Sequence, residues 1–214
     1  MDMQDLILYG AGGLAKEVTT LVREINEKKE VFRLIAYALD DEWYHEGMKL
    51  RGLPVISRKS LIEHRDDVVC ACAIGYPKDR RRVQESLKQE GVRFTNLLHP
   101  TTRMGEEVIM GEGCIVQPYS SVMDDCKLGD GIFLNGYVTL GHETVVEDYV
   151  TCFPRSQISG QVKIGEAACI GTMSFINEKR KIGAEAVIAP GSIVFGNVKE
   201  GSHVMGNPAK RIEL

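Results

Sequence analysis

Several common signals are missing from this 214-residue sequence, and each absence narrows its function. No stretch reaches the ~18 consecutive apolar residues of a membrane span. No basic run is longer than three residues in a chain of net charge −4, so we expect no nucleic-acid partner, and we interpret the run Arg80-Arg81-Arg82 as a solvated helix face rather than an anion site. No CxxC pair occurs among the six cysteines, and the first residues show no secretory signal. Both observations favour a reducing compartment, and we expect a cytoplasmic protein.

What the sequence does contain is a period of six that runs without interruption over residues 104–199. The lead position of each of the 16 hexads is apolar, and 15 of the 16 residues four positions later are small or β-branched, with Arg180 as the exception. Such hexapeptide repeats are typical of a parallel β-helix, in which three hexads form one coil of a triangular prism. Glycine often follows the lead residue, which we interpret as a corner whose backbone conformation favours glycine.

The first hundred residues lack this period and instead alternate apolar strand segments with helical ones. We predict strands at residues 6–9, 31–39, 52–56, 67–74 and 92–98, and helices at residues 16–25, 58–64 and 77–89. Such alternation predicts a parallel sheet covered by helices. The expected organisation is a Rossmann-like α/β domain at residues 1–100, followed by an all-β parallel β-helix domain at residues 101–214.

A glycine-rich loop joins the first predicted strand to the first helix. Gly10, Gly12 and Ala15 match the dinucleotide fingerprint, whose third glycine can be replaced by alanine. Such a loop holds a phosphate through backbone N–H groups, and Asp40, at the end of the second strand, would bind a ribose or sugar hydroxyl. A tight turn beside a solvated Asp40-Asp41 pair is the alternative. An NAD enzyme normally needs two such halves, so the short domain favours a nucleotide or nucleotide-sugar phosphate over nicotinamide.

One histidine, His142, lies within the 16 hexads, directly before Glu143. Histidine changes charge near neutral pH and so can accept a proton from a reacting group. A neighbouring carboxylate can hold the ring and raise its basicity. A neutral core histidine is the alternative. A single histidine argues against a zinc site built from three histidines, and we expect no metal.

Taken together, these motifs resemble the bacterial sugar acyltransferases that join a small Rossmann-like domain to a left-handed β-helix. That family includes nucleotide-amino-sugar N-acetyltransferases and the related sialic acid O-acetyltransferases. The resemblance covers nearly the whole chain and rests on residues 9–16, 73–75 and 96–100, on Asn135, on Gly141-His142-Glu143 and on residues 206–210. It implies a left-handed β-helix and a homotrimer in which acetyl-CoA lies between adjacent prisms.

The resemblance also implies roles for individual residues. His142 would be the general base for the attacking amine or hydroxyl, Glu143 would tune it, and Gly160 would offer its backbone N–H to the oxyanion. The acetyl-CoA groove would be lined by Thr151, Thr172, Ala189, Pro190 and Gly191. The nucleotide-sugar would contact Gly12, Gly13, Leu14, Asp40, Asp41, Gly75 and Asn135. Its sugar would then reach His142 on a neighbouring subunit.

Two segments depart from many members of this family. Leu14 stands where they carry histidine, which removes a polar contact. Phe153-Pro154-Arg155 replaces a smaller stretch that contains glycine. Arg155 would either touch a CoA phosphate or lie at a solvated corner.

The sequence and the resemblance predict an acetyl-CoA-dependent N-acetyltransferase that acts on a nucleotide-linked amino sugar in bacterial surface glycan synthesis. The expected sugar is of the 4-amino-4,6-dideoxy type. O-acetylation of sialic acid or another sugar is the alternative reaction. A trimeric scaffold that binds a nucleotide-sugar without turnover is the alternative from another class. The His142-Glu143 pair argues against it, because a scaffold needs neither residue.

Overall fold

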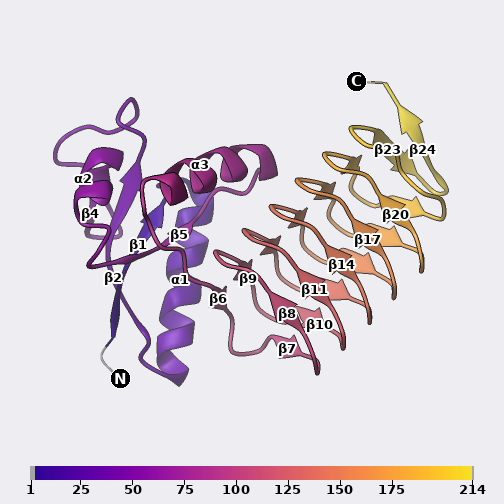
Figure 1. Cartoon of the computed structure of the whole chain (residues 1–214), viewed down its shortest axis with the longest axis horizontal. Helices are drawn as coiled ribbons and strands as arrows, with labels where there is room; N and C mark the ends of the chain where they lie inside the picture. The colour runs from indigo at the N-terminus through magenta and orange to yellow at the C-terminus, as the bar shows by residue number, and fades with distance from the viewer. Residues whose placement is uncertain (1–2, 214) are drawn as a thin grey trace.

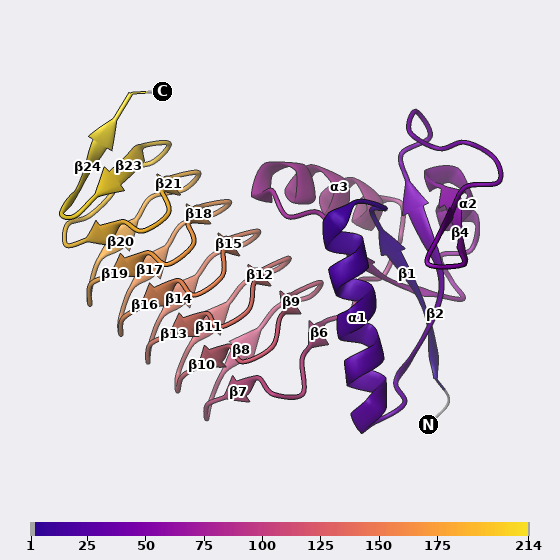
Figure 2. The ribbon, with the colours of Figure 1, turned by 180° about the vertical axis from the view of Figure 1, so that it is seen from behind.

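The computed structural model describes residues 3–213, and Figures 1 and 2 show it from opposite sides. An α/β domain lies beside the first coils of a prism of short stacked strands, and the last strands lie at the far end of that prism. The predicted fold class is confirmed: a Rossmann-like parallel sheet precedes a left-handed parallel β-helix. None of the helices within residues 3–213 combines the length and the apolar character that a membrane span needs.

The α/β domain is a five-stranded sheet in the order β3-β4-β2-β1-β5, flanked by three helices. Its strands are β1 (Gln4–Tyr9), β2 (Phe32–Leu39), β3 (Lys49–Leu50), β4 (Leu53–Ser57) and β5 (Val69–Cys72). Its helices are α1 (Gly13–Lys28), α2 (Arg58–Glu63) and α3 (Pro77–Gln89). All pairs are parallel except β3 with β4. The elements predicted for residues 6–89 are confirmed apart from shifts at their ends.

The central strand β1 is buried on both sides because its alternate side chains pack against different helices. Leu6 and Leu8 share a core with Val18 of α1, whereas Ile7 packs with Val83 of α3. β1 also runs parallel to β5. The loops that follow these two strands, residues 10–12 and 73–76, therefore lie at one edge of the sheet, where α/β folds bind ligands.

The β-helix has three faces, in which each two-residue strand pairs with the strand 18 residues away. We call the face against the α/β domain the docked face. It consists of β6 (Leu97–Leu98), β9 (Ile115–Val116), β12 (Phe133–Leu134), β15 (Thr151–Cys152), β18 (Cys169–Ile170), β21 (Val187–Ile188) and β23 (His203–Gly206). The antiparallel strand β24 (Ala209–Ile212) pairs with β23 and caps this sheet.

The other two faces differ at the first, outward-pointing position of their strands. Phe175 and Ile193 point outward from the face that we call apolar, whose other outward side chains are polar, and Lys127, Lys163 and Lys181 point outward from the lysine face. The apolar face consists of β7 (Arg103–Met104), β10 (Ser121–Val122), β13 (Thr139–Leu140), β16 (Gln157–Ile158), β19 (Phe175–Ile176) and β22 (Ile193–Val194). The lysine face consists of β8 (Ile109–Met110), β11 (Lys127–Leu128), β14 (Val145–Val146), β17 (Lys163–Ile164) and β20 (Lys181–Ile182).

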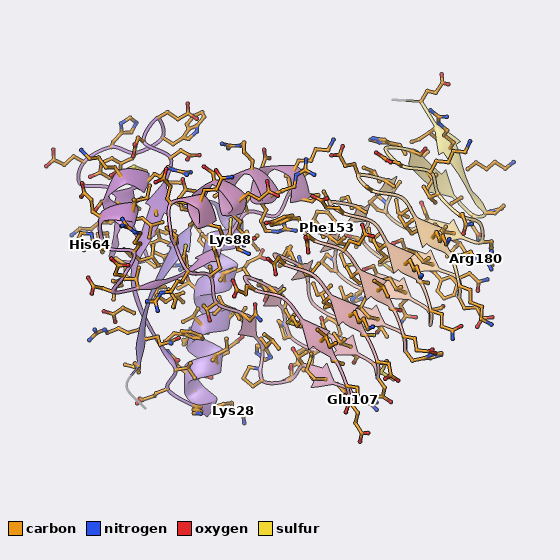
Figure 3. All side chains as sticks on the ribbon, viewed as in Figure 1. Lys28, His64, Lys88, Glu107, Phe153 and Arg180 are labelled. Atoms are coloured by element: carbon orange, nitrogen blue, oxygen red, sulfur yellow. The ribbon has the colours of Figure 1, made fainter. Side chains whose placement is uncertain are left out.

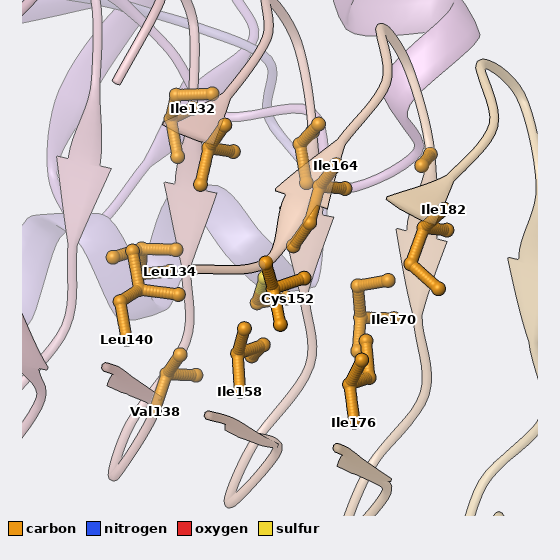
Figure 4. Packing of buried hydrophobic residues seen from close by; sticks show 14 of the residues in the cluster. Ile132, Leu134, Val138, Leu140, Cys152, Ile158, Ile164, Ile170, Ile176 and Ile182 are labelled. Atoms are coloured by element: carbon orange, nitrogen blue, oxygen red, sulfur yellow. The ribbon is translucent and has the colours of Figure 1, made fainter. Parts of the chain in front are cut away.

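The lead residues of the hexads fill the interior of the prism, as predicted. Each is the second residue of its strand and points toward the axis, so the leads of successive coils stack, as Leu140, Ile158 and Ile176 do in Figure 4. These three side chains are at most 2% exposed. Met104 is 37% exposed, because its strand β7 is the edge strand of its sheet.

The glycines that follow lead residues have a different cause from the predicted one. Positive φ occurs instead at the fourth position of the hexads, where Tyr119 and Tyr137 have φ of 61° and 62°. At the second position, a Cβ on Gly141 would overlap the backbone nitrogen of Gly160 in the next coil. Glycine is needed there because successive coils approach closely, not because of its own backbone conformation.

One predicted strand, residues 92–98, is divided between the two domains. Phe94 forms a bridge to Cys70 of β5, whereas β6 pairs with β9 of the docked face. The prediction of a single strand in the α/β sheet is therefore wrong, because an apolar pattern does not reveal which sheet a strand joins. The first β-helix strand lies before residue 101.

Candidate active site

His142 and Glu143 lie at the corner between the apolar face and the lysine face, directly after β13. Nδ1 of His142 is 2.9 Å from Oε2 of Glu143. Since a carboxylate can only accept hydrogen bonds, Nδ1 carries a proton, and in the neutral form of the ring Nε2 has the lone pair. The His142 side chain is 62% exposed, so the alternative of a core histidine is wrong.

A second contact fixes the carboxylate of Glu143. Gln161, one coil further on, donates from Nε2 to the same Oε2 at 2.9 Å. The hydrogen bonds from His142 and then from Gln161 lower the pKa of the Glu143 carboxyl below its ordinary value. Glu143 is therefore an anion at neutral pH and holds the His142 ring in one orientation.

Gly160 lies one coil beyond His142 and adjoins the imidazole ring. A Cβ built on Gly160 would be 2.5 Å from Nε2 of His142, so the ring occupies the space that a larger residue would need. Within residues 3–213, the backbone N–H of Gly160 donates no hydrogen bond. A basic nitrogen and an unpartnered N–H donor thus lie close together, and acyl transfer to an amine or hydroxyl requires both.

An apolar groove of about 500 Å³ adjoins His142 on the apolar face. Its lining crosses four successive coils and includes Met123, Thr139, Gln157 and Phe175. A surface of this kind suits the uncharged chain of a thioester substrate or a second protein surface.

The corner that carries His142 is opposite to the docked face. The α/β domain packs on the first strands of the docked face, where Ile115, Phe133 and Thr151 are buried, and reaches both corners beside them, with α1 next to Asn135 and α3 next to Gly131. Figure 3 shows Glu107, which lies on the His142 corner, at the edge of the prism away from the α/β domain, and Phe153 on the side toward it. The His142 corner and the α/β domain of one chain therefore lie on opposite sides of the prism.

The glycine residues predicted to bind the nucleotide-sugar lie together at the edge of the α/β sheet where the parallel strands β1 and β5 end. A Cβ on Gly12 or Gly13 would meet no atom within 4 Å, so their backbone faces open space. Helix α1 has no side-chain cap and no acidic residue in its first turn, which suits an anion. Leu14 closes the gap to the neighbouring loop, since its Cδ2 is 3.7 Å from the position of a Cβ on Gly75.

Asp40 is engaged by other protein groups. Its Oδ1 accepts a hydrogen bond from the Tyr9 hydroxyl at 2.6 Å, and Arg58 and Arg82 lie 3.5 and 3.7 Å from the carboxylate. Burial and then the hydrogen bond to Asp40 raise the pKa of Tyr9. Asp41 accepts from a backbone N–H of α2. A nucleotide at this edge would therefore meet two guanidinium groups beside the carboxylate, rather than a solvated pair of aspartates.

Asn135 follows β12 at the corner beside α1. Its Oδ1 accepts from the backbone N–H of Gly136 at 2.7 Å. Its side chain also lines a groove of about 330 Å³ with Glu17 and Thr20 of α1. Asn135 therefore lies on the same side of the prism as the glycine-rich loop, away from His142.

The predicted acetyl-CoA residues do not all lie at one place. Four of them are brought together on two successive coils, where a backbone hydrogen bond of 2.8 Å links the coils: Thr172, Ala189, Pro190 and Gly191. Thr151 is instead fully buried under the α/β domain, and its hydroxyl donates to the Gly75 carbonyl at 2.8 Å. The hydroxyl of Thr151 is thus not at the protein surface.

Arg155 contacts an aromatic ring, and Arg80 is buried. The guanidinium of Arg155 lies 5.4 Å from the ring centroid of Tyr137, which stacks on Tyr119 at 5.0 Å. Arg80 is 1% exposed, so its interpretation as part of a solvated face is wrong. Arg80, Val83 and Leu87 follow one another at helical spacing on the buried face of α3, and this spacing is the feature of the sequence that could have identified Arg80 as buried.

Among residues 3–213, no group of three or more His, Cys, Asp or Glu side chains is placed to hold a metal.

Comparison with known proteins identifies relatives for both domains. Residues 5–87 match the family of PglD N-terminal domains. Over 212 residues the chain is 28% identical to a GDP-perosamine N-acetyltransferase of Escherichia coli O157:H7, and the match covers 96% of this chain and 95% of the relative.

Two solved structures match over almost their whole length. WeeI from Acinetobacter baumannii AYE is 30% identical with a TM-score of 0.86, and the match covers 97% of this chain and 99% of WeeI. The acetyltransferase domain of PglB from Neisseria gonorrhoeae FA1090, in complex with acetyl coenzyme A, is 24% identical with a TM-score of 0.86. It covers 99% of this chain and shares its fold. The chain belongs to the family of nucleotide-amino-sugar N-acetyltransferases, in which a PglD N-terminal domain precedes a left-handed β-helix.

Proposed function

We propose that this protein transfers the acetyl group of acetyl-CoA to the amine of a nucleotide-linked amino sugar of the 4-amino-4,6-dideoxy type, in bacterial surface glycan synthesis. The observation that carries the proposal is the pairing of His142 and Glu143 beside the backbone N–H of Gly160, which donates no hydrogen bond to any residue that the structure describes. The match to a GDP-perosamine N-acetyltransferase over 95% of that relative supports the substrate class. The free, mostly buried cysteines are compatible with a cytoplasmic site of synthesis.

In the proposed reaction His142 is the general base. Its Nε2 accepts the proton that the sugar nitrogen loses as that nitrogen bonds to the acetyl carbon. Glu143 accepts the Nδ1–H of the same ring and stabilises the positive charge that the ring acquires. The N–H of Gly160 donates to the acetyl oxygen as negative charge develops there. Acetyl-CoA supplies the acetyl group, and CoA leaves as a thiolate when the carbon–sulfur bond breaks. The thiolate then takes up the proton held on Nε2 of His142, which regenerates the base.

The acetyl-CoA side of the site is proposed to follow the apolar face and the corner beside it. The groove next to His142 would accept the thioester end. Thr172, Ala189, Pro190 and Gly191 would contact the remainder of the molecule. The hydroxyl of Thr151 cannot serve in this way in the structure as described, because it is directed into the domain contact.

We infer that the active site is shared between chains of a homotrimer. His142 lies opposite to the docked face, whereas Gly12, Gly13 and Asn135 lie on the side of the α/β domain. A sugar held by these residues therefore needs a His142 from another copy. The apolar face, with Met123 and Phe175 on its surface, is suited to contact between copies, whereas the third face presents a row of exposed lysines to solvent.

A product analysis tests the function directly. The protein is incubated with acetyl-CoA and UDP-, GDP- or dTDP-linked 4-amino sugars, and products are identified by mass spectrometry, with His142→Ala as the control. We expect one acetylated product that resists mild base, as an amide does. A product labile to mild base would be an ester and would favour O-acetylation. Absence of turnover on every acceptor would contradict the proposal and favour a scaffold.

A further inference from the structure

A buried arginine without an acidic partner connects the two domains. Arg80, near the start of α3, is 1% exposed, and within residues 3–213 no carboxylate forms an ion pair with it. Burial lowers the pKa of its guanidinium to about 10, so the group is still charged at neutral pH. A buried charge is unfavourable unless hydrogen bonds compensate for the lost water. The groups that Arg80 binds should therefore explain its presence.

All three guanidinium nitrogens of Arg80 donate hydrogen bonds. Nη1 binds a loop of the α/β domain, donating to the carbonyl oxygens of Ile74 and Gly75, each at 2.9 Å. The other two nitrogens bind the β-helix. Nε donates to the carbonyl of Gly131 at 2.7 Å. Nη2 donates to the carbonyls of Tyr149 at 2.7 Å and Val150 at 3.2 Å, and to Oγ1 of Thr151 at 2.9 Å. One side chain thus ties a loop of the first domain to two coils of the second.

The loop that Arg80 holds belongs to the proposed nucleotide-sugar site. It follows β5, and it adjoins the glycine-rich loop through the contact between Leu14 and Gly75. The carbonyl of Gly75 also accepts the hydroxyl of Thr151, from β15. A hydrogen-bond network centred on Arg80 therefore fixes the position of this loop along the axis of the prism.

We propose that Arg80 is a positioning residue for acetyl transfer: it fixes the Gly75 loop against β15 and so sets where the bound sugar is presented relative to the prism. The inference rests on the proposed function. Lysine cannot replace this arrangement fully, because a single ammonium nitrogen with three protons cannot span acceptors in two domains as a planar guanidinium does.

The chain offers a matched control on the same helix. Gln84, one turn after Arg80, is also fully buried and donates from Nε2 to the Gly113 carbonyl of the β-helix at 3.2 Å. Its side chain forms no hydrogen bond with Ile74 or Gly75. Gln84→Met therefore removes a hydrogen bond between the domains without touching the loop, whereas Arg80→Lys affects both.

The test is steady-state kinetics on both variants, with the amino-sugar acceptor found for the wild type. We expect Arg80→Lys to raise KM for the nucleotide-sugar by about tenfold while KM for acetyl-CoA stays within twofold of the wild type. Gln84→Met should leave both constants within twofold. An unchanged nucleotide-sugar KM in folded Arg80→Lys, or an equal rise in Gln84→Met, would overturn the role of Arg80.

A second pair of variants covers the case in which Arg80→Lys does not fold. Thr151→Val keeps the side-chain shape but removes the hydroxyl that donates to Gly75, and Thr151→Ser restores it. The nucleotide-sugar KM should rise in the valine variant and recover in the serine variant, and equal values in both would overturn the proposal. If the wild-type protein acetylates no amino sugar, the proposed function itself fails, which is a different result from wild-type turnover with unaffected variants.

Discussion

Gly160→Ala tests whether the position of the His142 ring controls the reaction. The substitution keeps the backbone N–H of residue 160 and adds one methyl group. That methyl carbon would be 2.5 Å from Nε2 and 2.8 Å from Cε1 of His142. Gly160 is not among the residues of positive φ, so alanine can adopt its backbone conformation.

The size of the effect follows from this contact. Carbon and nitrogen atoms in ordinary contact are separated by at least 3.4 Å, so the ring must move by about 1 Å. A misplacement of that size at a reacting group lowers the rate by about 10². The cost in stability should stay below about 1 kcal/mol, because the ring is the exposed end of a flexible side chain and can turn outward.

The assay compares kcat and the melting temperature of Gly160→Ala with those of Gly196→Ala. Gly196 also has a φ outside the positive range, and a Cβ there would meet no atom within 4 Å, so its variant should behave like the wild type. A kcat of Gly160→Ala within threefold of the wild type would refute the reasoning. In a His142→Ala background the same substitution should add little. A further loss of about 10² there would show that the methyl group acts on the substrate and not through His142.

Three further predictions concern the base, the domain contact and the core. His142→Asn should lower kcat by about 10² to 10⁴ and leave the acetyl-CoA dissociation constant, measured by calorimetry, unchanged. Burial raises the pKa of Asp130, but the hydrogen bonds from Lys88 and a backbone N–H outweigh it, and the pKa lies below its ordinary 3.8. A lowered carboxyl pKa stabilises the folded state above that ordinary value and loses its effect as the pH falls through the folded pKa. The melting temperature of Lys88→Met should therefore fall below that of the wild type at pH 7, which corresponds to a loss of stability of up to about 1 kcal/mol. The difference should shrink as the pH falls below the ordinary pKa of 3.8 and through the lowered pKa of Asp130. A difference that persists at low pH would contradict this assignment. Leu140→Ala should reduce the free energy of unfolding by about 2–5 kcal/mol, because Leu140 is fully buried, and a denaturant titration would measure the loss.

Much of the β-helix could be predicted because its determinants are local. The side chain at the lead position of each hexad points to the axis whatever the rest of the chain does, and Leu140 and Ile158 stack because they are 18 residues apart. The role of the second-position glycines was harder to infer. Gly141 is needed because Gly160 of the next coil lies against it, and one hexad considered alone does not contain that information.

The division of residues 92–98 between two sheets shows the limit of strand prediction. Phe94 and Leu97 are both buried and apolar, yet Phe94 joins Cys70 in the first domain and Leu97 joins Ile115 in the second. The choice depends on which backbone donors and acceptors each residue meets in three dimensions. No periodicity within seven residues can specify it.

The candidate-site residues that could be predicted are related by the period of the prism, whereas those that could not depend on contacts with the α/β domain. His142, Glu143, Gly160 and Gln161 come together because they are adjacent in sequence or one coil apart, so the period of the prism brings them to one corner. Which residues contact the α/β domain depends on the face of the prism against which that domain packs, and the hexad pattern is the same on all three faces. Thr151 therefore had the sequence context of a surface position, although its hydroxyl lies buried in the hydrogen-bond network that holds the Gly75 loop.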